Sequence, residues 1–303
     1  MRGFYAVGTM AMLLLMLVVA GCGGGSDLTN QSSEMPAEEL ADEGIATLKL
    51  YVFECGRLRF DTVENFNIRD DETAVRELVV PCYIIDHPDG RMIWDGGLPS
   101  HVADTEGWHD NERIGRTARL DQTLAEQLAE LELGFDLGSL DYMAFSHIHY
   151  DHVGVANEII GAQWLVQQGD FDAAFSETVT VPAVQSELLE NLRNNDRLIL
   201  DGDHDVFGDG RVQIISAPGH TPGHQVLFLD LDETGPLVLS GDLYHFRLSR
   251  EDRRVPVFNV DPDLSLISME RVEAFVDDRN ATMWIEHDLA LFETLRAAPQ
   301  FYD

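Results

Sequence analysis

The feature that most constrains this chain is a short segment that reads Ser146-His147-Ile148-His149-Tyr150-Asp151-His152. Four side chains that can bind metal occur there in the order His-x-His-x-Asp-His. Side chains two positions apart point to the same side of an extended segment, so His147 and His149 can hold one ion. Asp151 and His152 follow where the backbone turns, which directs them toward a second ion. The segment therefore predicts a catalytic site with two metal ions, and a solvated histidine-rich loop is the alternative.

Three further candidate ligands stand at the ends of predicted strands. Ligands at the ends of successive strands can converge on one rim of a sheet, where the scaffold holds them rigidly. Taken singly, each of the three is more often a cap or a surface group, but together with the histidine-rich segment they reinforce one another. They are His220 in the Gly/Pro-rich turn 217–224, Asp242 after the apolar run 236–241, and His287 after the segment 283–286.

In this order the candidate ligands resemble the metallo-β-lactamase fold superfamily, whose pattern is HxHxDH followed by His, Asp and His. The resemblance covers residues 46 to 303 and implies an α/β fold, an αββα sandwich in a single domain. Asp95, in the segment 94–99, matches the superfamily's Asp-x-Gly turn and is expected to orient ligands; a plain Asp-Gly turn is the alternative. The resemblance implies a first metal ion on His147, His149 and His220, a second on Asp151, His152 and His287, and Asp242 as the bridge between them.

The same resemblance narrows the activity. Aspartate at the bridging position is unusual among the β-lactam hydrolases of the superfamily, whereas its thioesterases, lactonases, phosphodiesterases and sulfatases keep it. The alternatives are a glyoxalase II-like thioesterase, a phosphodiesterase, or a lipid-anchored metal-binding protein with little turnover. The segments that resemble the quorum-quenching N-acyl homoserine lactonases, which open the lactone ring of bacterial signals, are 78–83, 87–90, 220–225, 241–244 and 284–288.

The chemistry that follows from this resemblance requires no protein nucleophile. Two divalent ions lower the pKa of a shared water enough to supply hydroxide at neutral pH, and this hydroxide would attack the lactone carbonyl. Asp151 or Asp242 would pass a proton to the leaving oxygen. Zinc suits a set of His and Asp ligands, and manganese, iron or cobalt can occupy such a set as well.

One position departs from the lactonase pattern. The best-known lactonases carry a tyrosine three residues after the bridging aspartate, where it contacts the substrate carbonyl. Here that position holds His245, and the tyrosine is Tyr244. On an extended backbone these two side chains point in opposite directions. Tyr244 and His245 both remain candidates for the catalytic contact, and a different substrate, or no catalytic role for either residue, is the alternative.

The N-terminus predicts export and a lipid anchor. A short basic start precedes the apolar run 10–20, which has the length of a secretory signal core and is too short for a spanning helix. The segment 17–22 reads as a lipobox, with cleavage before Cys22 and lipid attached to it. The domain would then be anchored in the bacterial cell envelope, on the periplasmic or extracellular face. We therefore expect a lipoprotein signal peptide at 1–21, a flexible acidic tether at 22–45, and the hydrolase domain at 46–303.

Composition limits the partners of the chain and the state of its cysteines. The formal net charge of −34 argues against nucleic acid, because phosphate binding needs a basic surface. Such acidity suits high salt, which screens self-repulsion, and slightly favours a neutral lactone as the substrate. Cys55 and Cys82 could form a disulfide in an oxidising compartment, but the sequence alone favours two buried thiols. A homodimer is implied by the family resemblance only.

Apolar runs and helical periodicity place the remaining elements. The segment 123–133 has helical periodicity, and 142–145 reads as the strand that delivers the metal-binding segment. The polar segment 98–119 is expected to be an exposed loop, or a flap over the site that packs Trp108 on an acyl chain. Further predicted strands are 48–53, 78–85, 91–94, 163–167, 197–200, 212–215, 226–229 and 237–239, and further helices cover 183–193 and 265–276.

Overall fold

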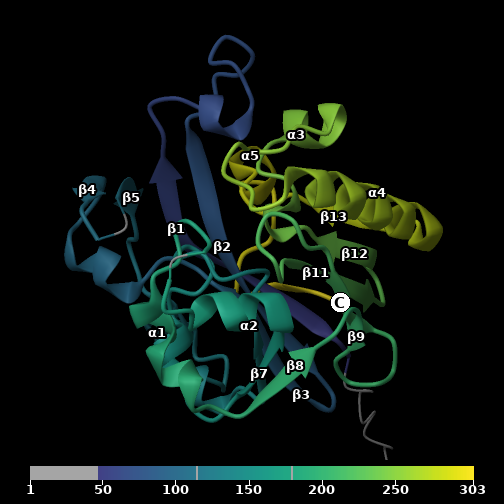
Figure 1. Cartoon of the computed structure of the whole chain (residues 1–303). Helices are drawn as coiled ribbons and strands as arrows, with labels where there is room; N and C mark the ends of the chain where they lie inside the picture. The colour runs from purple at the N-terminus through teal and green to yellow at the C-terminus, as the bar shows by residue number, and fades with distance from the viewer. Residues whose placement is uncertain (1–46, 114, 179) are drawn as a thin grey trace, which may run out of the picture. The chain divides into compact units, whose positions relative to one another are not determined.

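Two β-sheets pack face to face, with helices on both outer sides, in the computed structural model, which describes residues 47–113, 115–178 and 180–303 (Figure 1). This αββα sandwich confirms the expected fold class. The lipobox, the signal segment and the tether lie outside the described residues. Within the ranges described, no helix combines the length and the apolar character needed to cross a membrane.

The first sheet contains nine of the described strands, in the order β4-β5-β1-β2-β3-β6-β7-β8, with β14 paired to the start of β1. Strands β3, β6, β7 and β8 run parallel, so their carboxyl ends reach the same edge of the sheet. The strands are β1 (Lys49–Arg59), β2 (Glu77–His87), β3 (Gly90–Gly96), β4 (His109–Asn111), β5 (Arg116–Arg119), β6 (Tyr142–Ala144), β7 (Gln163–Gln167), β8 (Arg197–Leu200) and β14 (Phe301–Tyr302).

The second sheet has five described strands, in the order β13-β12-β11-β10-β9. Its strands β12 and β13 are parallel, and the remaining neighbours are antiparallel. The carboxyl ends of β12 and β13 therefore meet at one edge of this sheet. The strands are β9 (His204–Asp205), β10 (Val212–Ser216), β11 (Gln225–Leu231), β12 (Gly235–Leu239) and β13 (Thr282–Trp284).

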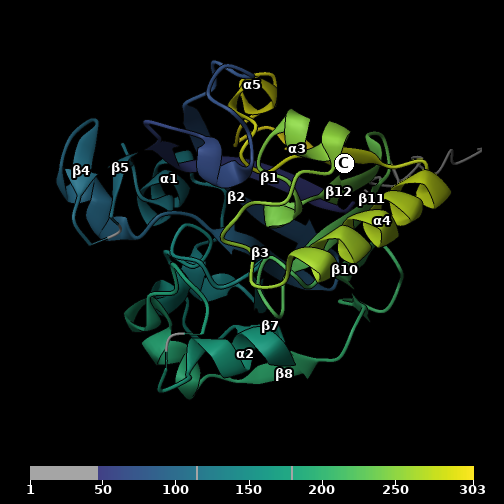
Figure 2. The ribbon, with the colours of Figure 1, turned by 45° about the horizontal axis from the view of Figure 1, so that its top comes forward.

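Helices cover the outer faces of both sheets, and Figure 2 shows the longest of them, α4, lying along the second sheet. Helix α1 begins at a capping box, in which Thr123 and Glu126 satisfy each other's backbone N–H groups. The helices are α1 (Leu124–Leu131), α2 (Gln168–Ala174), α3 (Arg247–Asp252), α4 (Pro262–Arg279) and α5 (Leu289–Phe292). Short 3₁₀ helices cover Glu64–Phe66, Ser100–Asp104, Leu137–Ser139, Ala156–Glu158, Ser186–Arg193 and Gly241–Leu243.

Alternating side chains of β1 separate two of the apolar layers. Leu50 and Val52 lie in the cluster between the two sheets, whereas Tyr51 and Phe53 face the layer that contains α1. This alternation follows from the two-residue period of a strand that is buried on both faces. A third cluster, between the second sheet and α4, includes Met269.

The structure corrects three expectations from the sequence. Cys55 and Cys82 form a disulfide rather than two thiols, because neighbouring strands β1 and β2 bring their Cα atoms to 5.7 Å. The segment 98–119 is not simply a loop, since it contains the β4–β5 hairpin that pairs with β1. The expected helix at 183–193 is a 3₁₀ helix confined to Ser186–Arg193.

Candidate metal centre

Both sheets deliver the candidate ligands at the carboxyl ends of their strands. The histidine-rich segment follows β6 in the first sheet. His220 follows β10, Asp242 follows β12, and His287 follows β13 in the second sheet. The structure brings all seven predicted ligands together in two adjoining buried groups. The site therefore lies where the edges of the two sheets meet.

The first group joins three imidazoles and one carboxylate. Nε2 of His147 lies 2.8 Å from Nδ1 of His149, and Nε2 of His220 lies 3.2 Å and 3.1 Å from these two atoms. Oδ2 of Asp242 lies 3.5 Å from Nε2 of His147 and 3.1 Å from Nε2 of His220. In a tetrahedral zinc site with bonds of about 2.0–2.1 Å, ligand atoms are separated by roughly 3.3–3.4 Å. These spacings are close to those of such a tetrahedron.

The second group adjoins the first through the other oxygen of Asp242. Its members are Asp151, His152 and His287, whose ligand atoms lie within 4.8 Å of one another. Oδ1 of Asp242 lies 2.8 Å from Nε2 of His287 and 3.5 Å from Nε2 of His152. The carboxylate of Asp242 therefore faces one donor group with each oxygen, as a bridging ligand does.

Hydrogen bonds on the far side of the rings fix which nitrogen faces the centre. The Nδ1–H of His287 donates to the carbonyl oxygen of Val79 at 2.7 Å, because a carbonyl only accepts. Nε2 of a neutral His287 then turns a lone pair toward a carboxylate oxygen, so a proton or a cation must lie between them. Asp95 fixes His152 in the same way, since its Oδ2 lies 3.1 Å from Nδ1. Asp95 thus holds the orienting position expected from the sequence.

Burial and neighbouring charges set the protonation of the candidate ligands. Burial lowers the pKa of His147 and of His149 far below the usual value, which keeps these rings neutral and able to coordinate. Burial alone would raise the pKa of Asp242, but the surrounding imidazoles, His245 first, hold it well below its usual value. Burial opposes protonation of His287, but the Asp242 carboxylate raises the pKa of that ring. An ionised carboxylate among imidazoles therefore draws positive charge into the centre.

His245 and Tyr244 point to opposite sides of the chain. Nε2 of His245 lies 3.0 Å from Oδ2 of Asp242, and its ring lines the pocket. Tyr244 packs instead in the cluster beneath α4, where burial and the carboxylate of Glu273 raise the pKa of its hydroxyl. Tyr244 is extended (φ −141°, ψ 132°), so neighbouring side chains alternate in direction. Of the two candidates for the catalytic contact, His245 lines the cavity and Tyr244 does not.

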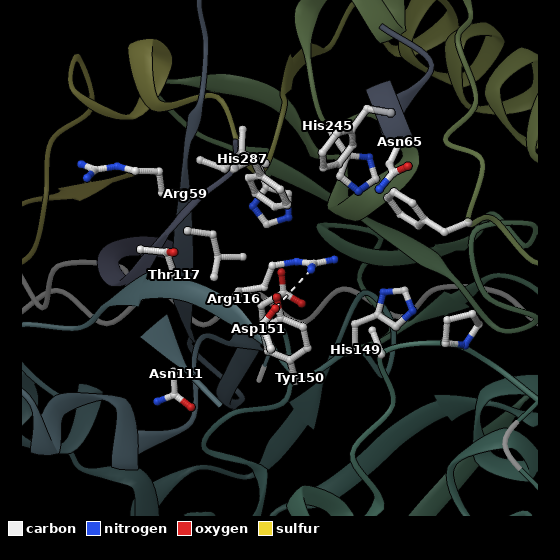
Figure 3. A pocket seen from close by; sticks show the side chains of 18 of the residues that line it. Arg59, Asn65, Asn111, Arg116, Thr117, His149, Tyr150, Asp151, His245 and His287 are labelled. Atoms are coloured by element: carbon white, nitrogen blue, oxygen red, sulfur yellow. Dashed lines mark hydrogen bonds between the residues drawn. The ribbon is translucent and has the colours of Figure 1, made fainter. Parts of the chain in front are cut away.

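A cavity of about 830 Å³ opens onto the two donor groups. Phe66 and Phe258 form part of an apolar wall, and their rings are 5.4 Å apart. Figure 3 shows Asp151 pointing into the cavity next to Tyr150 and Arg116. The guanidinium of Arg116 hydrogen-bonds the hydroxyl of Tyr150. One polar and one apolar side suit a small ligand that has a reactive head and an apolar tail.

The β4–β5 hairpin forms part of the cavity wall, but Trp108 does not line it. The ring of Trp108 carries the guanidinium of Arg59 at 3.9 Å from its centroid. The residues of this region that line the cavity are Asp110, Asn111, Glu112, Gly115, Arg116 and Thr117. The segment expected to form a flap thus contributes a hairpin wall, and Trp108 lies outside the residues that line the cavity.

Two buried carboxyl groups support the site and were not predicted from the sequence. Asp170 accepts hydrogen bonds from the hydroxyl of Thr221 at 2.8 Å and the N–H of Gly223 at 2.7 Å, which anchors the turn that carries His220. Glu286 lies against Asp95, and burial followed by the charge of Asp95 raises its pKa well above the usual value. Asp170 stands in no motif, and Glu286 lies in the lactonase-like segment 284–288 without a predicted role, so only the folded chain reveals their contacts.

Comparisons with known proteins identify a set of similar chains. The sequence profile of the metallo-beta-lactamase superfamily matches residues 75–283. The N-acyl homoserine lactonase AttM of Rhizobium radiobacter is 27% identical over 269 residues, which cover 84% of this chain and 98% of AttM. The N-acyl homoserine lactonase AiiA of Bacillus thuringiensis subsp. kurstaki is 26% identical over 255 residues, again covering 84% and 98%.

Solved structures of N-acyl homoserine lactonases are also similar to this chain. An N-acyl homoserine lactone hydrolase with the product N-hexanoyl-L-homoserine at its catalytic metal centre is 26% identical, with a TM-score of 0.70. The superposition covers 85% of this chain and 100% of that one. The dizinc quorum-quenching lactonase AidC is 17% identical with a TM-score of 0.58, over 86% and 95% of the two chains, and this likeness concerns the fold alone.

Proposed function

Because this chain belongs to the metallo-β-lactamase superfamily, we propose that it is a metal-dependent hydrolase that opens the ester ring of N-acyl homoserine lactones. The observation that carries the proposal is the Asp242 carboxylate, which faces one buried donor group with each oxygen beside an open cavity. The AttM and AiiA lactonases support the substrate class, because this chain matches 98% of the length of each.

The donor atoms fit two divalent ions. His147, His149 and His220 would hold the first, Asp151, His152 and His287 the second, and Asp242 both. Imidazole nitrogens and carboxylate oxygens suit zinc, and the same atoms accept manganese, iron or cobalt. Bound there, the ions would supply an activated water at neutral pH and would polarise the ester carbonyl.

A carboxyl group of the protein would transfer the proton that the leaving oxygen needs. The carboxyl group of Asp151 lines the cavity, whereas both oxygens of Asp242 are directed at imidazoles. Asp151 is therefore better placed to accept the proton that the attacking water gives up and to pass it to the oxygen that leaves when the ring opens. The cost of a free alkoxide is avoided if that proton arrives as the C–O bond breaks.

His245 would hold the position that faces the substrate carbonyl. Its ring lines the cavity, and its Nε2 lies 3.0 Å from Oδ2 of Asp242. A neutral imidazole has a single N–H, so His245 would donate toward a bound ester when the metal ions, in its place, hold the Asp242 carboxylate. Donors fixed in advance stabilise the charge that develops on the carbonyl oxygen. Phe66 and Phe258 would then contact the acyl chain.

A location outside the cytoplasm is also proposed. The lipobox that ends at Cys22 would give a lipid-anchored protein of the bacterial envelope. The disulfide between Cys55 and Cys82 supports an oxidising compartment, because such bonds are rare in reducing cytosol. Metabolic labelling with a palmitate analogue tests the anchor, since Cys22→Ser should abolish the label.

The test of activity is hydrolysis by the purified zinc-loaded protein, in low and in high salt. N-acyl homoserine lactones with short and long chains are compared with γ-butyrolactone, a glutathione thioester and a bis-aryl phosphate. Preferred opening of the acylated lactones supports the proposal. Turnover of the thioester or phosphodiester without lactone opening would keep the metal site and discard this substrate class.

A further inference from the structure

Asn259 is a buried amide that contacts a candidate metal ligand from outside both donor groups. It lies in the loop between α3 and α4, 39 positions from His220 in the sequence. Its Oδ1 lies 2.9 Å from Nδ1 of His220, and its Nδ2 donates to the hydroxyl of Ser265 at 2.9 Å. A buried amide with partners at both ends has one fixed orientation.

The direction of these bonds follows from Ser265. Its hydroxyl proton donates to the carbonyl oxygen of Asp261 at 2.8 Å, so its oxygen can only accept from Asn259. The amide nitrogen therefore faces Ser265 and the amide oxygen faces His220. Since that oxygen only accepts, Nδ1 of His220 must carry the proton. Nε2 is left with its lone pair, directed at His147 and His149.

The same loop holds the backbone that carries His220. The N–H of Val260 donates to the carbonyl of His220 at 3.2 Å, and the N–H of Asp261 donates to the carbonyl of Gly219 at 2.9 Å. Gly219 has a φ of +138°, and a Cβ there would lie 2.4 Å from the backbone nitrogen of Ser265. The turn that carries His220 and the start of α4 thus pack too closely to admit a side chain at position 219.

We propose that Asn259 is a positioning residue that fixes the tautomer and direction of His220 and so sets the affinity of the first metal position. This inference deepens the proposed function, because it rests on His220 being a ligand. Asn259 lies outside the residues that line the cavity, and it acts through the imidazole of His220. Partners of this kind change metal affinity by roughly 10–100-fold when they are removed.

Zinc titration of the metal-free protein against a chromophoric chelator tests the proposal without any substrate. Asn259→Leu removes the acceptor while keeping the volume, and should weaken one of two zinc ions by about 10–100-fold with the other little changed. Asn259→Asp restores an acceptor for His220 and should bind both ions nearly as the parent protein does. Asn191→Leu removes an exposed amide that contacts neither donor group, and should have no effect.

Two further measurements separate positioning from folding. The visible spectrum of the cobalt-substituted protein reports the geometry at the ions, and should change in Asn259→Leu but not in Asn259→Asp. The melting temperature of the metal-free protein reports the fold. Unchanged zinc affinity in Asn259→Leu, or equal loss at both positions with a lower melting temperature, would overturn the proposal. A protein that binds two zinc ions but opens no lactone would refute the proposed substrate and leave the role of Asn259 intact.

Discussion

Oδ1 of Asp242 lies 2.8 Å from Nε2 of His287, although the other nitrogen of that ring already donates to a backbone carbonyl. Two atoms that both carry lone pairs face each other at this distance only when a proton or cation lies between them. The same carboxylate faces Nε2 of His220 at 3.1 Å with its other oxygen. Asp242 is therefore the residue on which both halves of the centre depend.

Replacing Asp242 should dismantle the centre. Asp242→Ala removes a donor from both groups, so elemental analysis should find at most one metal ion per chain. The value of kcat/KM for lactone opening should fall by at least ~10³-fold, because metal stabilisation of the transition state is worth several kcal/mol. The exposed Asp263→Ala is the matched control. Full activity in Asp242→Ala would rule out a two-metal mechanism.

Replacing His245 should lower kcat far more than replacing its neighbour Tyr244. Loss of a donor aimed at the reacting carbonyl costs about 10²–10³-fold in turnover, so His245→Ala should show a drop in kcat of this size. Tyr244→Phe should leave kcat within about twofold, because its hydroxyl lies outside the cavity and contributes nothing to transition-state binding. Steady-state kinetics on one acylated lactone suffices. Equal losses in both variants would contradict the placement of Tyr244.

The disulfide should contribute measurably to stability. Cys55 and Cys82 close a loop with a sequence separation of 27. Loop-closure entropy for that length predicts a loss of about 3.5 kcal/mol in the free energy of unfolding when the bond is removed. Urea unfolding of the Cys55→Ala/Cys82→Ala double variant, beside the parent protein, measures this loss. Free thiols at Cys55 and Cys82 in the parent protein, found by labelling after it is unfolded without reductant, would show that the bond is not formed.

Asp170 should give the metal-free protein a distinctive dependence on pH. Burial raises its pKa to about 6, against about 3.9 in an unfolded chain. The folded state therefore binds this proton more tightly, so the stabilisation is complete below about pH 4 and is lost as the pH rises through 6. The loss should approach ~3 kcal/mol for a shift of about two units.

Asp170→Asn tests that assignment, because the amide stays neutral and still offers an acceptor to Gly223 and a donor to Thr221. Urea unfolding in EDTA at pH 4.5 and pH 7 gives the difference in unfolding free energy between the variant and the parent. The parent should lose stability relative to the variant as the pH rises. A difference that is independent of pH would show that Asp170 does not titrate in this range.

The structure brings together every ligand predicted from the sequence. These ligands could be predicted because each stands in a local sequence pattern. The spacing within 147–152 and the strands that precede His220 and His287 depend on near neighbours in the chain. The partners of these ligands could not be predicted in the same way. Val79 is 208 positions from His287, and Asn259 is 39 positions from His220, so only tertiary packing brings them together.

Strand pairing explains two of the differences from expectation. Cys82 pairs with Phe53, and the register between β1 and β2 shifts between Glu54 and Arg57, beside Cys55. The disulfide therefore depends on a strand irregularity that the sequence does not predict. In the polar hairpin β4–β5, Thr117, Ala118 and Arg119 pair with β1, and Ala118 is the residue of β5 that is buried in the apolar core. Tyr244 and His245 were correctly expected to diverge, but the turn after β12 decides which of them enters the cavity.

The centre takes its donors from both sheets, so each bound ion would cross-link the two halves of the sandwich. An ion that binds only the folded chain adds about 2.7 kcal/mol of stability when its free concentration is 100 times its dissociation constant. With two such ions, the stability of the folded protein would depend on the concentration of free metal around it. A chelator would then stop turnover and would also destabilise the contact between the two sheets at the edges that carry the ligands.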